Sequence, residues 1–177
     1  AVAEEGRPDQ ALLSLLLNSI YALDRLNKPP ALVKAAFELR LLCVAGYEPL
    51  LDVCALCGEE APAQPRLDLG EGVLCCAACG ERGSASRPLD AVSLAAMRHV
   101  VYGDPKRLFS FSMNGESMAL MARACEDFLL TQLDRGFINS SIWAKKEGGR
   151  HETICCGRIY DPEVFRQSGG SGAAGPG

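Results

Sequence analysis

Apolar residues recur along the first 45 positions at the three- and four-residue steps of amphipathic helices. The first helix is expected over residues 10–27, with Pro29 and Pro30 ending it and opening a second helix over residues 31–45. The stripe of the first helix contains Leu12, Leu13, Leu16, Ile20 and Leu23, widened by Leu15, Leu17 and Tyr21. So wide a stripe predicts that this helix is buried on most of its sides, in a helical hairpin with the second.

The helical pattern returns in the second half of the chain. A helix is expected over residues 90–102 with Asp90 as its N-cap, followed by a short helical turn near residues 104–109. A long helix fits residues 115–135, with Gly136 as its stop. Its apolar side contains Met118, Met121, Ala122, Cys125, Leu129 and Leu133.

Two cysteine pairs between these helical parts carry the strongest chemical signal. They are Cys54-x-x-Cys57 and Cys76-x-x-Cys79, with 18 residues between the pairs. This separation matches the spacing of four-sulfur zinc sites. Each pair turns two sulfurs to one side, and a hairpin that reverses at residues 70–72 brings the pairs together around a tetrahedral ion.

One alternative ligand stays open, because the run CCAAC also allows Cys75 to pair with Cys79. Cys76 is preferred, since its spacing repeats that of the first pair and Cys75 would then point away. Four sulfurs leave no position for a catalytic water, so the zinc is expected to be structural. A disulfide framework is the main competing interpretation, and the lack of a visible export signal favours metal.

These patterns predict a mainly α fold class: a helical bundle domain with an inserted four-cysteine, zinc-ribbon-like hairpin and a disordered C-terminal tail. The expected divisions are a linker remnant at 1–9, a helical domain at 10–51 and 88–137, an inserted zinc module at 52–87, and an irregular tail at 138–177.

Composition and charge exclude several classes of function. The 177 residues are 48% hydrophobic, enough for a core, and no apolar run reaches about 18 residues, so a soluble protein without membrane contact is expected. The start without methionine suggests a partial chain. Residues 1–137 carry 13 basic and 18 acidic side chains, so direct DNA binding by this segment is expected to be weak or local. No phosphate-binding loop, GxSxG elbow or HExxH motif is present, and no enzyme is predicted.

Three segments form a specific combination along residues 10–137. They are FELRLLCVAGYEPLLDVCALCG at 37–58, GVLCCAACG at 72–80 and CEDFLLTQLDRGF at 125–137. Together they resemble the C-terminal region of the bacterial recombination mediator family RecO, in the same order of helices, zinc module and helices. The resemblance implies that the four paired cysteines are the family's zinc ligands and that an N-terminal OB-fold is absent from this sequence.

The resemblance also implies a DNA-repair mediator rather than an enzyme. RecO-like proteins bind DNA, anneal strands and work with RecR, and often RecF, to load RecA onto DNA coated with single-stranded-DNA-binding protein. A cytoplasmic, nucleoid-associated location follows. In some members the helical part receives the acidic tail of single-stranded-DNA-binding protein. Such a peptide needs an apolar groove with a basic rim, for which Lys34 and Arg40 are candidates by chemistry alone.

Two other hypotheses make distinct predictions. A zinc-ribbon transcription or RNA-processing factor should carry a basic, aromatic-rich ribbon, but residues 58–75 contain one Arg, no Lys and no aromatic residue. A metal-dependent hydrolase needs an open coordination site, which no nearby His or carboxylate completes. Residues 138–177 depart from the family pattern, and no function is assigned to them.

Overall fold

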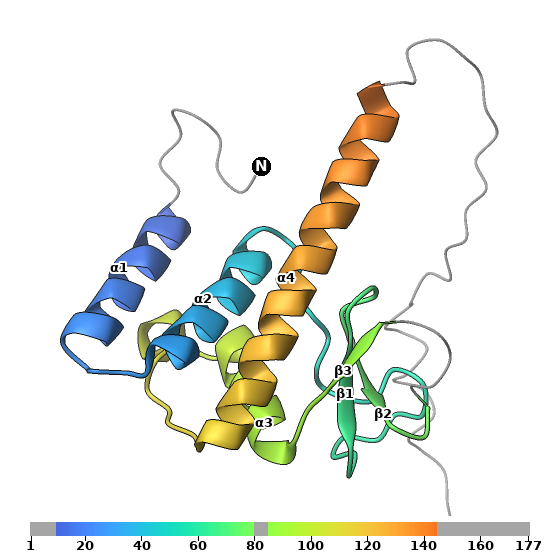
Figure 1. Cartoon of the computed structure of the whole chain (residues 1–177), viewed down its shortest axis with the longest axis horizontal. Helices are drawn as coiled ribbons and strands as arrows, with labels where there is room; N and C mark the ends of the chain where they lie inside the picture. Colours follow the sequence, from blue (N-terminus) through green and yellow to red (C-terminus); the bar gives the residue numbers. More distant parts are fainter. Residues whose placement is uncertain (1–9, 80–84, 145–177) are drawn as a thin grey trace, which may run out of the picture.

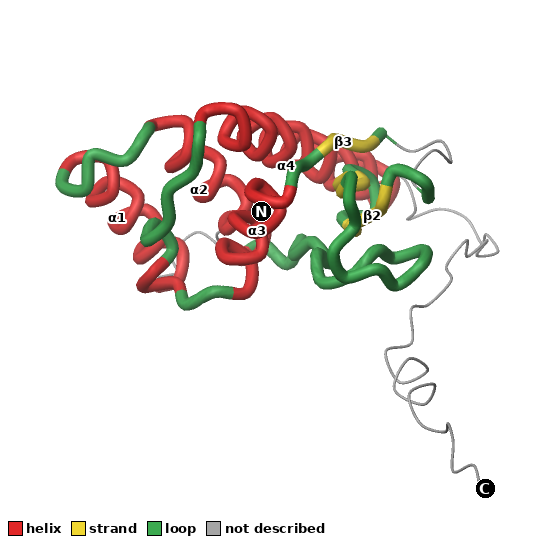
Figure 2. Tube along the Cα trace, turned by 90° about the horizontal axis from the view of Figure 1, so that it is seen from below, coloured by secondary structure: helices red, strands yellow, loops and turns green. Residues whose placement is uncertain are grey.

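In residues 10–79 and 85–144, which the computed structural model describes, the chain forms four α-helices, one 3-10 turn and a three-stranded sheet. The elements are α1 (Gln10–Asp24), α2 (Pro30–Val44), β1 (Pro65–Asp68), β2 (Val73–Cys76), β3 (Ser86–Pro88), α3 (Ala91–Tyr102), η1 (Pro105–Arg107) and α4 (Gly115–Ala144). The sheet lies beside α4, at the end of the molecule opposite α1 (Figures 1 and 2). The predicted mainly α fold with an inserted four-cysteine hairpin is confirmed.

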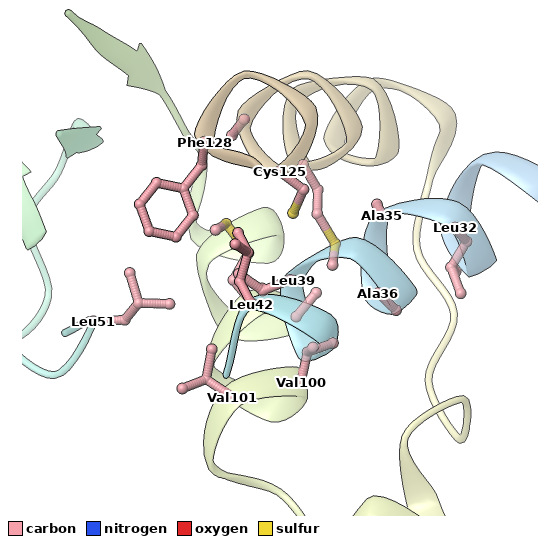
Figure 3. Packing of buried hydrophobic residues seen from close by; sticks show 14 of the residues in the cluster. Leu32, Ala35, Ala36, Leu39, Leu42, Leu51, Val100, Val101, Cys125 and Phe128 are labelled. Carbon is pink, nitrogen blue, oxygen red and sulfur yellow. The ribbon is translucent and has the colours of Figure 1, made fainter. Parts of the chain in front are cut away.

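The helix α2 is the centre of the core and packs against the other three helices. Leu32 and Leu39 of α2 are fully buried. They belong to one apolar cluster with Val100 of α3 and Phe128 of α4 (Figure 3). Met121 of α4 is a member of the same cluster. Fully burying a Leu or Phe side chain contributes about 1.5–3 kcal/mol, so this cluster dominates the stability of the helical part. No helix among the described residues is long and apolar enough to cross a membrane.

The start of α3 has the predicted cap. One carboxylate oxygen of Asp90 accepts the N–H of Ser93 at 2.6 Å, and the Ser93 hydroxyl oxygen accepts the N–H of Asp90 at 2.9 Å. The other oxygen of Asp90 accepts the hydroxyl of Ser117, at the start of α4, at 2.6 Å. This capping box therefore satisfies exposed amides of α3 and also joins the first turns of two helices.

The prediction that α1 is buried on most sides is wrong. Only Leu15, Ser19 and Ala22 are buried, because α1 stands at the edge of the bundle and packs mainly against α2. The small side chains of Ser19 and Ala22 allow the two helices to approach closely. The large apolar residues between 42% and 60% exposed include Leu13, Leu16, Leu17, Ile20, Tyr21 and Leu23 of this helix. The width of an apolar stripe thus gives the largest part of a helix surface that could be buried. The part that is actually buried depends on how many other elements pack against the helix.

Two elements extend beyond the predicted pattern. Gly136 does not stop α4, which continues to Ala144 and takes residues 138–144 out of the segment expected to be irregular. One glycine inside a helix costs about 1 kcal/mol relative to alanine, which is too little to end a long helix. Residues 86–88 form β3, which pairs with β1 although three residues are too few to show alternation in the sequence. The rest of the predicted tail, residues 145–177, lies outside the described residues.

Candidate metal centre

Four sulfurs gather at one end of the sheet. The Sγ atoms of Cys54, Cys57, Cys76 and Cys79 all lie within 4.8 Å of one another, and those of Cys57 and Cys76 are 3.9 Å apart. A tetrahedral zinc ion with Zn–S bonds of about 2.3 Å sets its sulfurs about 3.8 Å apart. The type, number and spacing of the donors therefore fit one zinc ion.

The β-hairpin brings the second cysteine pair to the first. β1 and β2 are antiparallel, with Leu67 opposite Leu74 and Pro65 opposite Cys76, so Cys76 stands at the open end of the hairpin. The first pair lies in the loop before β1. Its backbone is bound to β2, since the N–H of Ala55 donates to the carbonyl of Leu74 at 2.8 Å. Hydrogen bonds with β2 thus bring together the two cysteine pairs, which are separated by 18 residues in the sequence.

The first pair sits in a tight turn. The N–H of Gly58 donates to the carbonyl of Cys54 at 2.8 Å, and the N–H of Cys54 donates to the carbonyl of Glu59 at 2.8 Å. Gly58 has φ of +77°, a conformation that residues with a Cβ rarely adopt. The glycine after the pair therefore allows the chain to turn tightly.

Cys75 is separated from the cluster by strand geometry. Consecutive residues of a strand point to opposite faces, so Cys75 and Cys76 cannot both reach the same ion. The structure places Cys76 in the cluster and buries Cys75, which is 5% exposed. Burial raises the pKa of the Cys75 thiol. The structure thus brings Cys76, and not Cys75, together with the other three sulfurs, and the assignment of Cys76 as a ligand stays a prediction.

The four thiols differ in acidity before any metal is considered. Burial opposes ionisation of Cys54, but hydrogen bonds from the backbone N–H groups of Leu56, Cys57 and Cys76 outweigh it and lower the pKa of Cys54 to about 6. The N–H of Cys76 is 3.3 Å from the Cys54 sulfur. Hydrogen bonds with the sulfurs of Cys76 and Cys57 raise the pKa of Cys79 to about 12. Cys54 is therefore ionised more readily than Cys79, and a bound divalent ion would favour the thiolate form of its ligands.

Side chains of α4 hold the β1–β2 turn against the helical core. Gln132 is buried and donates to the carbonyls of Leu69 at 2.9 Å and Gly70 at 3.3 Å. Gly72, with φ of +66°, lies so close to Phe128 that an added Cβ would be 3.1 Å from its ring. Sequence reasoning missed Gln132. Its one signal is a polar side chain four positions after Phe128, on the apolar side of the helix.

A separate groove of about 700 Å³ lies between α1, α2 and η1. Its apolar lining includes Leu15, Leu17 and Leu108, and two basic residues, Arg40 and Lys106, also line it. The Arg40 guanidinium donates to the last carbonyls of α3, those of Val100 at 3.2 Å and Val101 at 2.8 Å. The arginine is therefore fixed in place at the groove.

Lys34 is not brought together with Arg40. Its ammonium lies 2.9 Å from Glu38 and 3.3 Å from Glu126 of α4, and its pKa is raised mainly by the hydrogen bond with Glu38. Six positions along a helix correspond to a rotation of about 240°, so the two basic residues point to different sides of α2. Of the two candidates, only Arg40 lines the groove.

Comparison with known proteins identifies the family. The family model described as "Recombination protein O C terminal" matches residues 1–141. The chain belongs to the RecO family. The resemblance inferred from the cysteine pairs and the flanking helices is thereby confirmed, and the chain matches the C-terminal region of this family.

Individual RecO relatives agree with this assignment. The chain is similar to DNA repair protein RecO of Symbiobacterium thermophilum, 30% identical over 138 residues that cover 76% of this chain and 54% of the relative. It is 24% identical to RecO of Acetivibrio thermocellus over 133 residues, 75% of this chain and 53% of the relative. RecO of Anaeromyxobacter dehalogenans is 39% identical over 97 residues. The chain thus spans about half the length of the first two relatives.

Proposed function

We propose that this chain is the C-terminal part of a non-enzymatic recombination mediator and that its cysteine cluster binds one structural zinc ion. The observation that carries the proposal is the coincidence of the RecO family match with four sulfurs at zinc spacing. In this role the protein acts in the bacterial cytoplasm at the nucleoid. DNA binding, and with it strand annealing, is proposed to rest mainly on the N-terminal part of RecO, outside the half that this chain matches. In the complete protein this region would help RecR, and often RecF, to load RecA.

A domain exchange tests the mediator function. Replacing the C-terminal half of the Symbiobacterium thermophilum relative with this chain should preserve RecA loading on DNA coated with single-stranded-DNA-binding protein. The acidic chain alone, with its net charge of −4, should anneal complementary strands poorly. Intact DNA binding by the hybrid without any RecA loading would contradict the proposal, and strong annealing by the chain alone would contradict the argument from charge.

The groove beside Arg40 is the proposed site for the acidic tail of single-stranded-DNA-binding protein. Its leucines offer apolar contacts, and Arg40 and Lys106 place two positive charges where a carboxylate would bind. Lys34 is the competing candidate, but two carboxylates already neutralise it. The proposed recognition therefore combines an apolar side chain in the groove with a terminal carboxylate at its basic rim.

Charge-reversal variants test whether the peptide binds in the groove or at the surface around Lys34. A fluorescent peptide copied from the tail of a bacterial single-stranded-DNA-binding protein should bind Lys106→Glu about tenfold more weakly than the wild type, a change of about 1.4 kcal/mol. Lys34→Glu is the matched control, with the same charge change on another side of α2, and should leave the affinity within about twofold. Fluorescence anisotropy measures both. The opposite ranking would place the peptide beside α4 instead of in this groove.

A further inference from the structure

Arg98 of α3 closes the base of the loop that carries the first cysteine pair. Its Nε donates to the carbonyl of Leu51 at 2.8 Å. Its Nη2 donates to the carbonyls of Asp52 at 2.7 Å and Glu60 at 2.8 Å. Residues 52 and 60 stand on either side of Cys54 and Cys57. One guanidinium group therefore holds both ends of the loop at the same point.

A second side chain of α3 fixes the approach to this loop. The Tyr102 hydroxyl accepts the N–H of Leu51 at 2.8 Å and donates to the carbonyl of Pro49 at 3.4 Å. Arg98 and Tyr102 are four positions apart and so share one face of the helix. Leu51 between these contacts is fully buried at the edge of the core (Figure 3). The chain is thus anchored to α3 before it reaches the first cysteine.

Apart from the backbone hydrogen bonds of its tight turn and the bond from Ala55 to β2, the loop has no regular structure to order it. Residues 52–60 contain turns and bends but no helix or strand. Ordering a residue costs about 1–2 kcal/mol of conformational free energy, and a site whose ligands are already in place avoids that cost when the ion binds. Hydrogen bonds from a charged guanidinium to carbonyls are stronger than neutral ones, which suits Arg98 to this role.

We propose that Arg98 is a positioning residue for the metal centre: it fixes the ends of the loop so that Cys54 and Cys57 face the second cysteine pair. The inference rests on the proposed zinc site. Arg98 touches no sulfur and acts through the backbone of the loop. A lysine can replace it only in part, because one ammonium group at the end of a flexible chain lacks the fork of donors that spans three carbonyls.

The rate of zinc release tests this role in the full chain loaded with zinc. A chromogenic chelator should remove zinc from Arg98→Met at least about tenfold faster than from the wild type, the effect typical of lost outer contacts around a metal site. Arg98→Lys should fall between the two. Arg123→Met is the matched control, since Arg123 is exposed on α4 and, within the described part of the chain, forms an ion pair with Asp127 alone, at 3.8 Å. Its release rate should stay within about twofold of the wild type.

Far-UV circular dichroism at the same temperature separates positioning from general stability. The proposal expects fast zinc release from Arg98→Met while the helical signal is unchanged. Release rates within twofold for Arg98→Met and the wild type would overturn it. If Arg98→Met fails to fold, Arg98→Lys is judged by the same criterion. A wild-type chain that binds no zinc would instead overturn the proposed metal site, and this inference with it.

Discussion

Two neighbouring cysteines in β2 have opposite surroundings. Cys76 is one of the four clustered sulfurs, whereas Cys75 is buried on the other face of the strand. The different surroundings of Cys75 and Cys76 follow from the alternation of side chains along a strand. A small shift of the loop that carries the first cysteine pair would not change them. At the scale of single residues, ligand identity is therefore set by strand register.

Substituting each cysteine by serine tests this assignment. Cys76→Ser removes a thiolate ligand and should lower the zinc bound per chain severalfold, because three sulfurs bind the ion far more weakly than four. Cys75→Ser should keep nearly full zinc content. Elemental analysis after dialysis measures both. Equal loss of zinc from the two variants would show that the ligand assignment is wrong.

At the scale of elements, Asp90 links the starts of α3 and α4. Burial disfavours its charged form, but hydrogen bonds from the Ser117 hydroxyl and the Ser93 N–H outweigh that effect and lower the pKa of the Asp90 carboxyl. A pKa that is lower in the folded protein means that the ionised group stabilises the fold. This contribution is present above the unfolded value of about 4 and is lost as the pH falls through the folded pKa.

Asp90→Ala should therefore lower the free energy of unfolding by about 1 kcal/mol at neutral pH, the usual value of an N-cap. The difference from the wild type should shrink as the pH falls below about 4, where Asp90 itself becomes protonated. Urea denaturation at several pH values measures this. Asp90→Asn keeps the acceptor oxygen without the charge, so it should be less destabilising and less sensitive to pH. A pH-independent defect in Asp90→Ala would contradict the role of the charge.

At the scale of the whole molecule, one apolar core joins the helices to the strands of the hairpin, whereas the four clustered cysteines lie outside it. Leu39, Met121 and Cys125 are fully buried among helices and lie in a core cluster that does not include the four clustered cysteines. The hairpin adds only short strands, with Leu67 and Leu74 as fully buried residues, and its first cysteine loop has no regular structure. The helical part should therefore be less dependent on metal than the hairpin.

Metal removal should affect these two parts unequally. Dialysis against a strong chelator should lower the melting temperature by about 5 °C or more while leaving the helical circular dichroism nearly unchanged. Amide hydrogen exchange should accelerate in residues 52–60 but little in α2. Collapse of the helical signal on chelation would mean instead that the helices depend on the ion for folding.

The sequence alone determined the features that local chemistry controls. The two CxxC pairs predicted the four cysteines that cluster because their spacing has few other uses, and Asp90 marks a helix start because its side chain caps amides within three residues. The face of α2 with Leu32 and Leu39 was also predictable, since periodicity and burial agree where a helix has neighbours on several sides.

Tertiary structure decided whatever depends on neighbours distant in sequence. The apolar stripe of α1 could not show that only one helix packs closely against it, and two basic residues on α2 could not show that Arg40 lines a groove while Lys34 pairs with acids. The contacts of Arg98 with residues 51, 52 and 60 span 38 to 47 positions of chain and leave no periodic trace. Local sequence patterns predict the helices and the cysteines that cluster. The exposure of side chains and the anchoring of loops depend on contacts between residues far apart in the sequence, so only the folded chain determines them.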